Sequence, residues 1–177
     1  RDLGDKQYIV IALHHLGLVA SELADFPHAR SLYEESLTLS RQIGYRRGTV
    51  TVLHALGRLA KQQGRLDEAG AHFRESLVTS HEMGDKRSIA IALADIAGIV
   101  DTLGEPERSG ALFGASASLR ENIGADLYST PGDRAAHEED IAIVRVRLGE
   151  KAWLQAWQKG HAMSTDEALT YALDAQI

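Results

Sequence analysis

The sequence of 177 residues lacks cysteine altogether, contains only three prolines, and has no apolar run of about 18 residues. Without cysteine, a disulfide framework and thiolate chemistry are excluded. Without a long apolar run, we expect no membrane-spanning helix and no membrane partner. No signal-peptide pattern is visible, and we expect a cytoplasmic protein. Because the chain begins at Arg1 without a methionine, we expect it to be a piece of a longer protein.

Positive charge is also scarce, since the net charge is −6. This balance argues against non-specific binding of nucleic acid, and we expect no direct nucleic-acid contact. Residues 41–74 are the exception, with seven basic residues against Asp67 and Glu68. This basic segment is either a binding surface or a solvated surface whose charges pair with acids of neighbouring segments.

Motifs of common catalytic and nucleotide-binding sites are missing as well. The segment beginning at His81-Glu82 lacks the second histidine of a zinc-protease helix, and the segment around Ser116 lacks the last glycine of a nucleophile elbow. None of the eight histidines forms a recognisable metal site with an acidic partner. We therefore expect no catalytic residues, no metal and no cofactor, and we expect that the chain is not an enzyme.

What the sequence does contain is a repeat, marked by glycines at positions 4, 44, 84 and 124, a constant spacing of 40. Other columns keep the same register, among them Leu16-Gly17 with Leu56-Gly57, and the aromatic residues Tyr33, Phe73 and Phe113. Self-similarity at such a period is typical of a solenoid. Each unit has two apolar stripes at helical spacing with a short break between them, which predicts a helix–turn–helix repeat.

The apolar spacing and the turn residues predict the helices. Their expected ranges are about 7–23, 27–42, 47–63, 67–82, 86–103, 106–122, 133–148, 150–159 and 164–175. In the first helix we expect five residues to face inward: Ile9, Ala12, Leu13, Leu16 and Ala20. Asp25 is expected to cap the second helix, and Gly44 to end it in a left-handed conformation.

These columns resemble the tetratricopeptide repeat, which has Leu-Gly in its first helix and then alanine, an aromatic and a small residue in its second. This chain departs from the pattern at Ala24 and Ala97, where the repeat has glycine, and its unit is longer than the standard ~34 residues. Its Gly-Asp-Arg/Lys joint resembles the C-terminal regions of LuxR-type and SARP/AfsR-like bacterial regulators with an ATPase module. It also resembles the repeats of kinesin light chain and of spindle-orientation scaffolds.

The resemblance implies an all-α fold, a right-handed solenoid of helical hairpins. We expect three 40-residue repeats over 1–124, followed by a degenerate fourth helix pair and a capping helix over 125–177. In this repeat class the first helix of each hairpin lines a concave groove. The groove-facing residues are then expected to be Ile11, His14, Leu18, Ser21, Thr51, His54, Arg58, Lys61, Ile91, Ala94, Gly98 and Asp101.

A stack of helical hairpins offers a surface for a partner rather than a catalytic constellation, so the resemblance implies a protein- or peptide-interaction module. We expect a regulatory or scaffold region of a larger bacterial signalling or transcription regulator. Its partner is expected to be a protein or peptide with an acidic group, or an upstream domain of the same parent chain. Two alternatives stay open: a small-molecule or anion sensor using the groove, and a self-association module that forms a homodimer.

Overall fold

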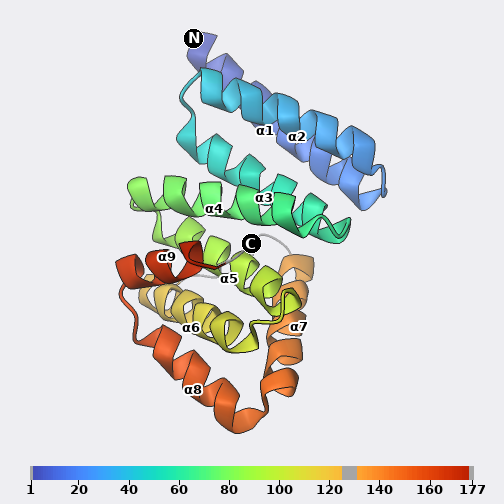
Figure 1. The fold of residues 1–177 in the computed structure, drawn as a ribbon. Helices are drawn as coiled ribbons and strands as arrows, with labels where there is room; N and C mark the ends of the chain where they lie inside the picture. The colour runs from blue at the N-terminus through green and yellow to red at the C-terminus, as the bar shows by residue number, and fades with distance from the viewer. Residues whose placement is uncertain (1, 125–130, 176–177) are drawn as a thin grey trace. The chain divides into compact units, whose positions relative to one another are not determined.

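The computed structural model describes residues 2–124 and 131–175, and within these ranges its regular secondary structure is entirely helical (Figure 1). The helices are α1 (Asp2–Glu22), α2 (Phe26–Gln42), α3 (Arg46–Gln62), α4 (Leu66–Glu82), α5 (Lys86–Thr102), α6 (Pro106–Ile123), α7 (Pro131–Leu148), α8 (Glu150–His161) and α9 (Thr165–Leu173). The prediction of an all-α arrangement of helical hairpins is confirmed. None of the described helices has the length and apolarity that a bilayer crossing requires.

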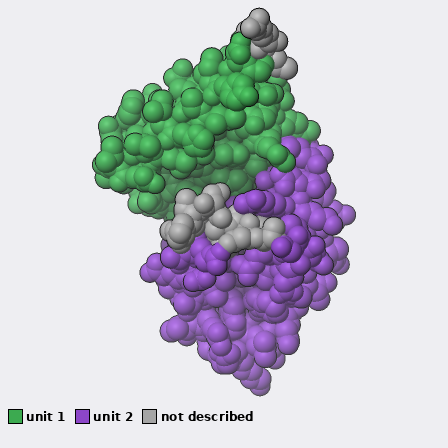
Figure 2. All heavy atoms as spheres, turned by 180° about the vertical axis from the view of Figure 1, so that it is seen from behind, with its two compact units in different colours: residues 1–79 green, residues 80–177 purple. Residues whose placement is uncertain are grey.

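The chain divides within α4 into two compact units, residues 1–79 and residues 80–177 (Figure 2). The first unit holds α1, α2, α3 and most of α4. The second holds α5 to α9. The third hairpin, formed by α5 and α6, therefore belongs to the same compact unit as α7, α8 and α9. The expected boundary between the repeats and the cap, at residues 124 and 125, stays a prediction.

In the first unit, an aromatic ring of each second helix lies on a glycine of the first helix. A Cβ atom added to Gly17 would overlap the ring of Tyr33, and one added to Gly57 would overlap the ring of Phe73. Both rings are fully buried. A glycine inside a helix costs about 1 kcal/mol relative to alanine, and here the bare Cα atom allows the paired helix to approach closely.

The buried face of α1 differs from the predicted one. Ala20 is buried as expected, but Ile9 and Leu16 are exposed, Leu16 to 56%. The equivalent Leu56 of α3 is only 3% exposed, because the side of α3 that carries it packs against α2. Within the described residues no helix covers this side of α1, so the prediction of an inward Leu16 was wrong.

Most hairpin turns use a glycine in the left-handed region, as the sequence predicts for Gly44, whose φ is +66°. The turn between α1 and α2 instead uses Ala24 with a φ of 59°. An L-residue with a Cβ atom is strained there by about 1–2 kcal/mol. Asp25 follows and accepts a hydrogen bond from the backbone N–H of His28 at 3.3 Å, which confirms it as the cap of α2.

In the second unit, α6 and α8 approach each other through glycines. A Cβ atom on Gly114 would overlap the backbone carbonyl of Trp157, and one on Gly160 would overlap that of Ala111. The α9 helix then begins with a capping box, in which Ser164 and Glu167 exchange hydrogen bonds with each other's backbone N–H groups.

The strained turn leads to a first prediction. Ala24→Gly removes the clash of the Cβ atom and should raise the free energy of unfolding by about 0.5–1 kcal/mol, after the entropic cost of glycine. Equilibrium urea denaturation measures it. Ala12→Gly, at an exposed helical position of α1, is the control and should lower stability by about 1 kcal/mol. An Ala24→Gly protein no more stable than wild type would show that the turn stores no strain.

The aromatic–glycine contact leads to a second prediction. Gly57→Leu forces a side chain into the ring of Phe73 and should destabilise the protein by about 1–3 kcal/mol. Arg58→Leu, one residue along on an exposed position, should leave the melting temperature nearly unchanged. Equal melting shifts for the two variants would contradict the orientation of α3.

Candidate functional site

The first row of predicted surface residues lies on α1. Ile11 and Leu18 are 38% and 40% exposed, and His14 and Ser21 are half-buried. Leu18 and Ser21 are three residues apart and therefore lie on one side of the helix. This row offers two accessible aliphatic side chains.

The second row lies on α3, which packs against α1. Thr51 and Arg58 are exposed, and His54 and Lys61 are half-buried. The Thr51 hydroxyl donates to the carbonyl of Arg47 at 3.0 Å and so bonds to its own helix. His54, Arg58 and Lys61 follow at spacings of four and three residues, which places them on one side of α3. We call the residues of the two rows the α1–α3 surface.

Both histidines of this surface contact the aromatic ring of their own hairpin. The ring centroids of His14 and Tyr33 are 5.9 Å apart, and those of His54 and Phe73 are 6.2 Å apart. The Nε2 atom of His54 also lies 2.9 Å from the Ser76 hydroxyl. Each histidine thus contacts the same aromatic ring that packs against the glycine of its hairpin. The buried rings of the core therefore also position side chains of the α1–α3 surface.

The charge of the surface comes from α3 rather than from His14. Burial, with a smaller effect of the neighbouring His15, lowers the pKa of His14 to about 4, so its ring is neutral at pH 7. Burial raises the pKa of Tyr33 to about 12, while Arg58 acts to lower it and Glu22 to raise it. Arg58 therefore lies close to the first hairpin, beside the row on α1.

Other bases of the basic segment pair with acids away from this surface. Arg41 of α2 forms an ion pair with Glu75 of α4, and Arg65 pairs with Glu68 at 2.5 Å. For Arg41 the expectation of a base paired with an acid of a neighbouring segment is met, whereas Arg65 pairs with an acid of its own segment. The Arg41–Glu75 pair links α2 and α4 at exposed positions, where an ion pair contributes little to stability. The Arg65–Glu68 pair is local, since its residues are three apart at the start of α4.

The third predicted row, on α5, differs from the other two. Ile91 is half-buried, and Ala94, Gly98 and Asp101 are buried, with Asp101 only 6% exposed. The buried residues of this row are therefore not accessible to a partner in this structure. The sequence could not show this, because the helix that meets this row comes from a segment with a weaker register.

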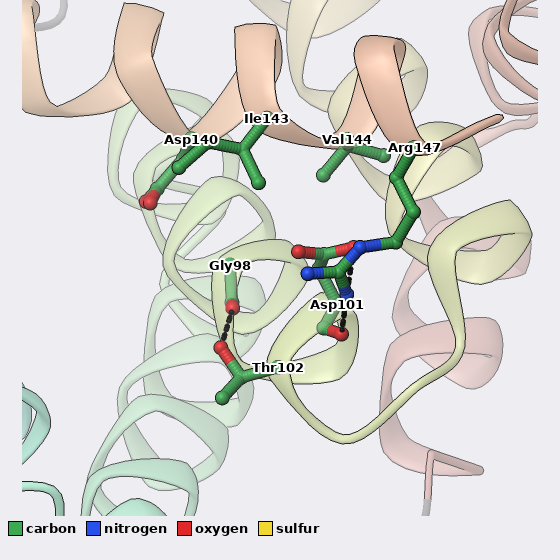
Figure 3. A pocket seen from close by; sticks show the side chains of 7 residues that line it. All are labelled: Gly98, Asp101, Thr102, Asp140, Ile143, Val144 and Arg147. Carbon is green, nitrogen blue, oxygen red and sulfur yellow. Dashed lines mark hydrogen bonds and ion pairs between the residues drawn. The ribbon is translucent and has the colours of Figure 1, made fainter. Parts of the chain in front are cut away.

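That helix is α7, whose Arg147 reaches Asp101 (Figure 3). The Nη1 atom of Arg147 donates to the Asp101 carbonyl at 2.8 Å and to its Oδ1 atom at 3.1 Å. A buried carboxylate is costly unless it is paired, and Arg147 supplies a partner. The contact also places a cation at the last turn of α5, where the helix dipole favours it.

A cavity of about 230 Å³ lies beside this ion pair, lined by Gly98, Asp101, Thr102, Asp140, Ile143, Val144 and Arg147. Pockets for small-molecule ligands usually measure about 300–1,000 Å³. The size of this cavity therefore fits a gap between two packed helices better than a ligand site.

The aromatic residue of the third hairpin, Phe113, also meets a histidine, but from a different helix. His137 of α7 contacts its ring edge-on, with centroids 5.3 Å apart. Burial lowers the pKa of His137, and the nearby Arg120 lowers it further. The first helix of this hairpin has Ala94 where the other two have His14 and His54, so α7 supplies the missing ring.

Sequence reasoning did not single out Arg147 or His137. The pairing of His14 and His54 with the aromatic residues was also missed, although both sets recur at the 40-residue period. That shared register was the available signal. Among the described residues, no group of three histidine, aspartate or glutamate side chains is arranged to hold a metal ion.

Comparison with known proteins identifies part of the chain. Residues 8–79 match the family model of the tetratricopeptide repeat, which supports a tetratricopeptide-repeat domain there. The matched segment is less than half of the chain and falls within the first unit. No curated protein matches the sequence. Repeats of this family generally mediate protein–protein interaction or scaffolding and are typically non-catalytic.

The Asp101–Arg147 pair leads to a third prediction. Arg147→Leu leaves the buried carboxylate without this partner and should lower the free energy of unfolding by about 1–2 kcal/mol, a figure reduced because Arg147 is half-exposed. Arg145→Leu is the matched control, since Arg145 pairs with the exposed Glu150 and its loss should not change the melting temperature. Similar losses in urea denaturation would contradict the role assigned to the buried pair.

Proposed function

We propose that this chain is a non-catalytic protein- or peptide-binding module, and that the α1–α3 surface receives a partner with a carboxylate or another anionic group. The observation that carries the proposal is the side of α3 formed by Arg58 and Lys61, two cations one helical turn apart in a chain of net charge −6. Arginine can bind a carboxylate through two parallel hydrogen bonds, which favours an acidic group over a neutral one.

Apolar contacts from α1 complement this charge. Ile11 and Leu18 expose more than a third of their surface on the same row as Ser21. Aliphatic side chains beside a cationic pair suit a peptide with both apolar and acidic residues. The match of residues 8–79 to the tetratricopeptide repeat supports the same class of partner.

A small anion bound by both histidines and both cations, the alternative sensor function, has less support. His14 is neutral and lies against Tyr33, and His54 is bonded to Ser76. His14 adds no positive charge, and the His54 ring is engaged within its own hairpin, so the surface favours a peptide over a free anion.

The context of the module rests on the resemblance of its 40-residue repeat. We place it in the regulatory or scaffold region of a larger bacterial signalling or transcription regulator, in the cytoplasm. An upstream domain of that parent chain is then a natural candidate for the acidic partner. The net negative charge supports a protein partner rather than nucleic acid.

A binding titration tests the proposal. A set of fluorescent acidic peptides of varied sequence is titrated with wild type and with the double variant Arg58→Ala/Lys61→Ala, and anisotropy is measured at low and moderate salt. Loss of two charge-assisted contacts should weaken binding by about tenfold or more. The difference should shrink as salt rises.

The control is Arg41→Ala/Arg47→Ala, which removes the same charge from exposed positions of the first unit outside the α1–α3 surface. It should bind as wild type does, apart from a small change common to all acidic peptides. If the Arg58/Lys61 double variant keeps wild-type affinity at both salt concentrations, the proposed surface is wrong.

A further inference from the structure

In the second unit, one helix of the chain packs on the predicted groove residues of another. In α5, Gly98 and Asp101 occupy the predicted groove positions, and α7 lies against them (Figure 3). Ile143 and Val144 line the same gap, and Arg147, one turn further along α7, bonds Asp101. An aliphatic pair followed by a charged residue thus forms the contact face of α7.

The 40-residue register transfers these positions to the first unit. Gly98 corresponds to Arg58 of α3 and Leu18 of α1, and Asp101 corresponds to Lys61 and Ser21. In contrast to Gly98, both Leu18 and Arg58 are exposed. At Leu18 and Arg58 the first unit therefore exposes the position that is buried beside α7 in the second unit, whereas Ser21 and Lys61 are half-buried.

The charge at the key position is inverted between the two units. Where α5 has the acidic Asp101, α3 has the basic Lys61, with Arg58 one turn before it. A helix that lies on α3 as α7 lies on α5 needs a carboxylate where α7 has Arg147, because like charges at that contact are repulsive. The same argument disfavours α7 of a second copy as the occupant.

We infer that the α1–α3 surface binds an amphipathic α-helix, rather than an extended strand, and that this helix carries an aspartate or glutamate one turn after an aliphatic pair. The aliphatic pair contacts Leu18 and Ile11, and the carboxylate accepts hydrogen bonds from Lys61 and Arg58. The inference rests on the proposed function, since it specifies the conformation and pattern of the acidic partner.

Three synthetic peptides based on residues 134–148 test this inference on the full chain. The acidic peptide carries Arg147→Glu. The broken peptide carries Arg147→Glu and Ala142→Pro, which disrupts the helix at a position exposed in α7 and so leaves the contact face intact. The basic peptide keeps the native Arg147. Anisotropy gives the affinities, and circular dichroism of the bound mixtures reports helix formation.

The acidic peptide should bind wild type at least about tenfold more tightly than either other peptide, with a gain of helix on binding. Lys61→Glu should reverse the preference, so that the basic peptide binds more tightly than the acidic one. Arg58→Glu is a second variant at an exposed position and should shift the preference in the same direction.

Failure of this inference is distinguishable from failure of the proposed function. If the broken peptide binds as tightly as the acidic one, and both lose affinity to Lys61→Glu, the helical partner is overturned while an acidic partner at this surface is supported. If the acidic peptide does not bind while unrelated acidic peptides depend on Arg58 and Lys61, the α7-like pattern is likewise overturned. If no acidic peptide binds, both proposals fail.

Discussion

The contact on which the first unit depends is the placement of an aromatic ring on a glycine of the paired helix. Tyr33 on Gly17 and Phe73 on Gly57 set how closely each hairpin closes, because any larger residue at the glycine overlaps the ring. The same rings also contact His14 and His54. The packing of the core therefore also positions the residues of the α1–α3 surface. Arg58, for example, directly follows Gly57, against which the ring of Phe73 packs.

The second unit follows the same repeat in sequence, but different residues make its helix contacts. Its first helix lacks a histidine at the equivalent position, and His137 of α7 contacts Phe113 instead. Bare backbone is used between α6 and α8, where Gly114 and Gly160 each face a carbonyl of the other helix. In α5, whose sequence follows the repeat, Ala94, Gly98 and Asp101 of the predicted row are buried, and Asp101 pairs with Arg147. The rows of α1 and α3 instead keep some of their residues exposed, among them Leu18 and Arg58.

The equivalent positions of α5 and α3 differ in charge. Asp101 is buried and needs a cation, which the chain supplies from α7 through Arg147. Arg58 and Lys61 stand at the equivalent positions of α3, where Arg58 is exposed and Lys61 is half-buried. A few residues of the first helix thus decide whether these positions of a repeat are covered by another helix of the chain, as in α5, or carry exposed basic charge, as in α3. This difference is the basis for taking the second unit as a physical model of the proposed contact between the first unit and a partner.

The sequence by itself determined the helices, their turns and the two-helix unit, because 3.6-residue spacing, glycine in left-handed turns and the cap at Asp25 are local properties. It also determined that Arg58 and Lys61 share one side of α3. Only the tertiary structure decided which sides are covered. Leu16 and Leu56 have the same register, yet one is exposed and the other buried, because burial depends on whether another helix packs there. Asp101 became inaccessible for the same reason, since Arg147 is 46 residues away in sequence and no local pattern joins them.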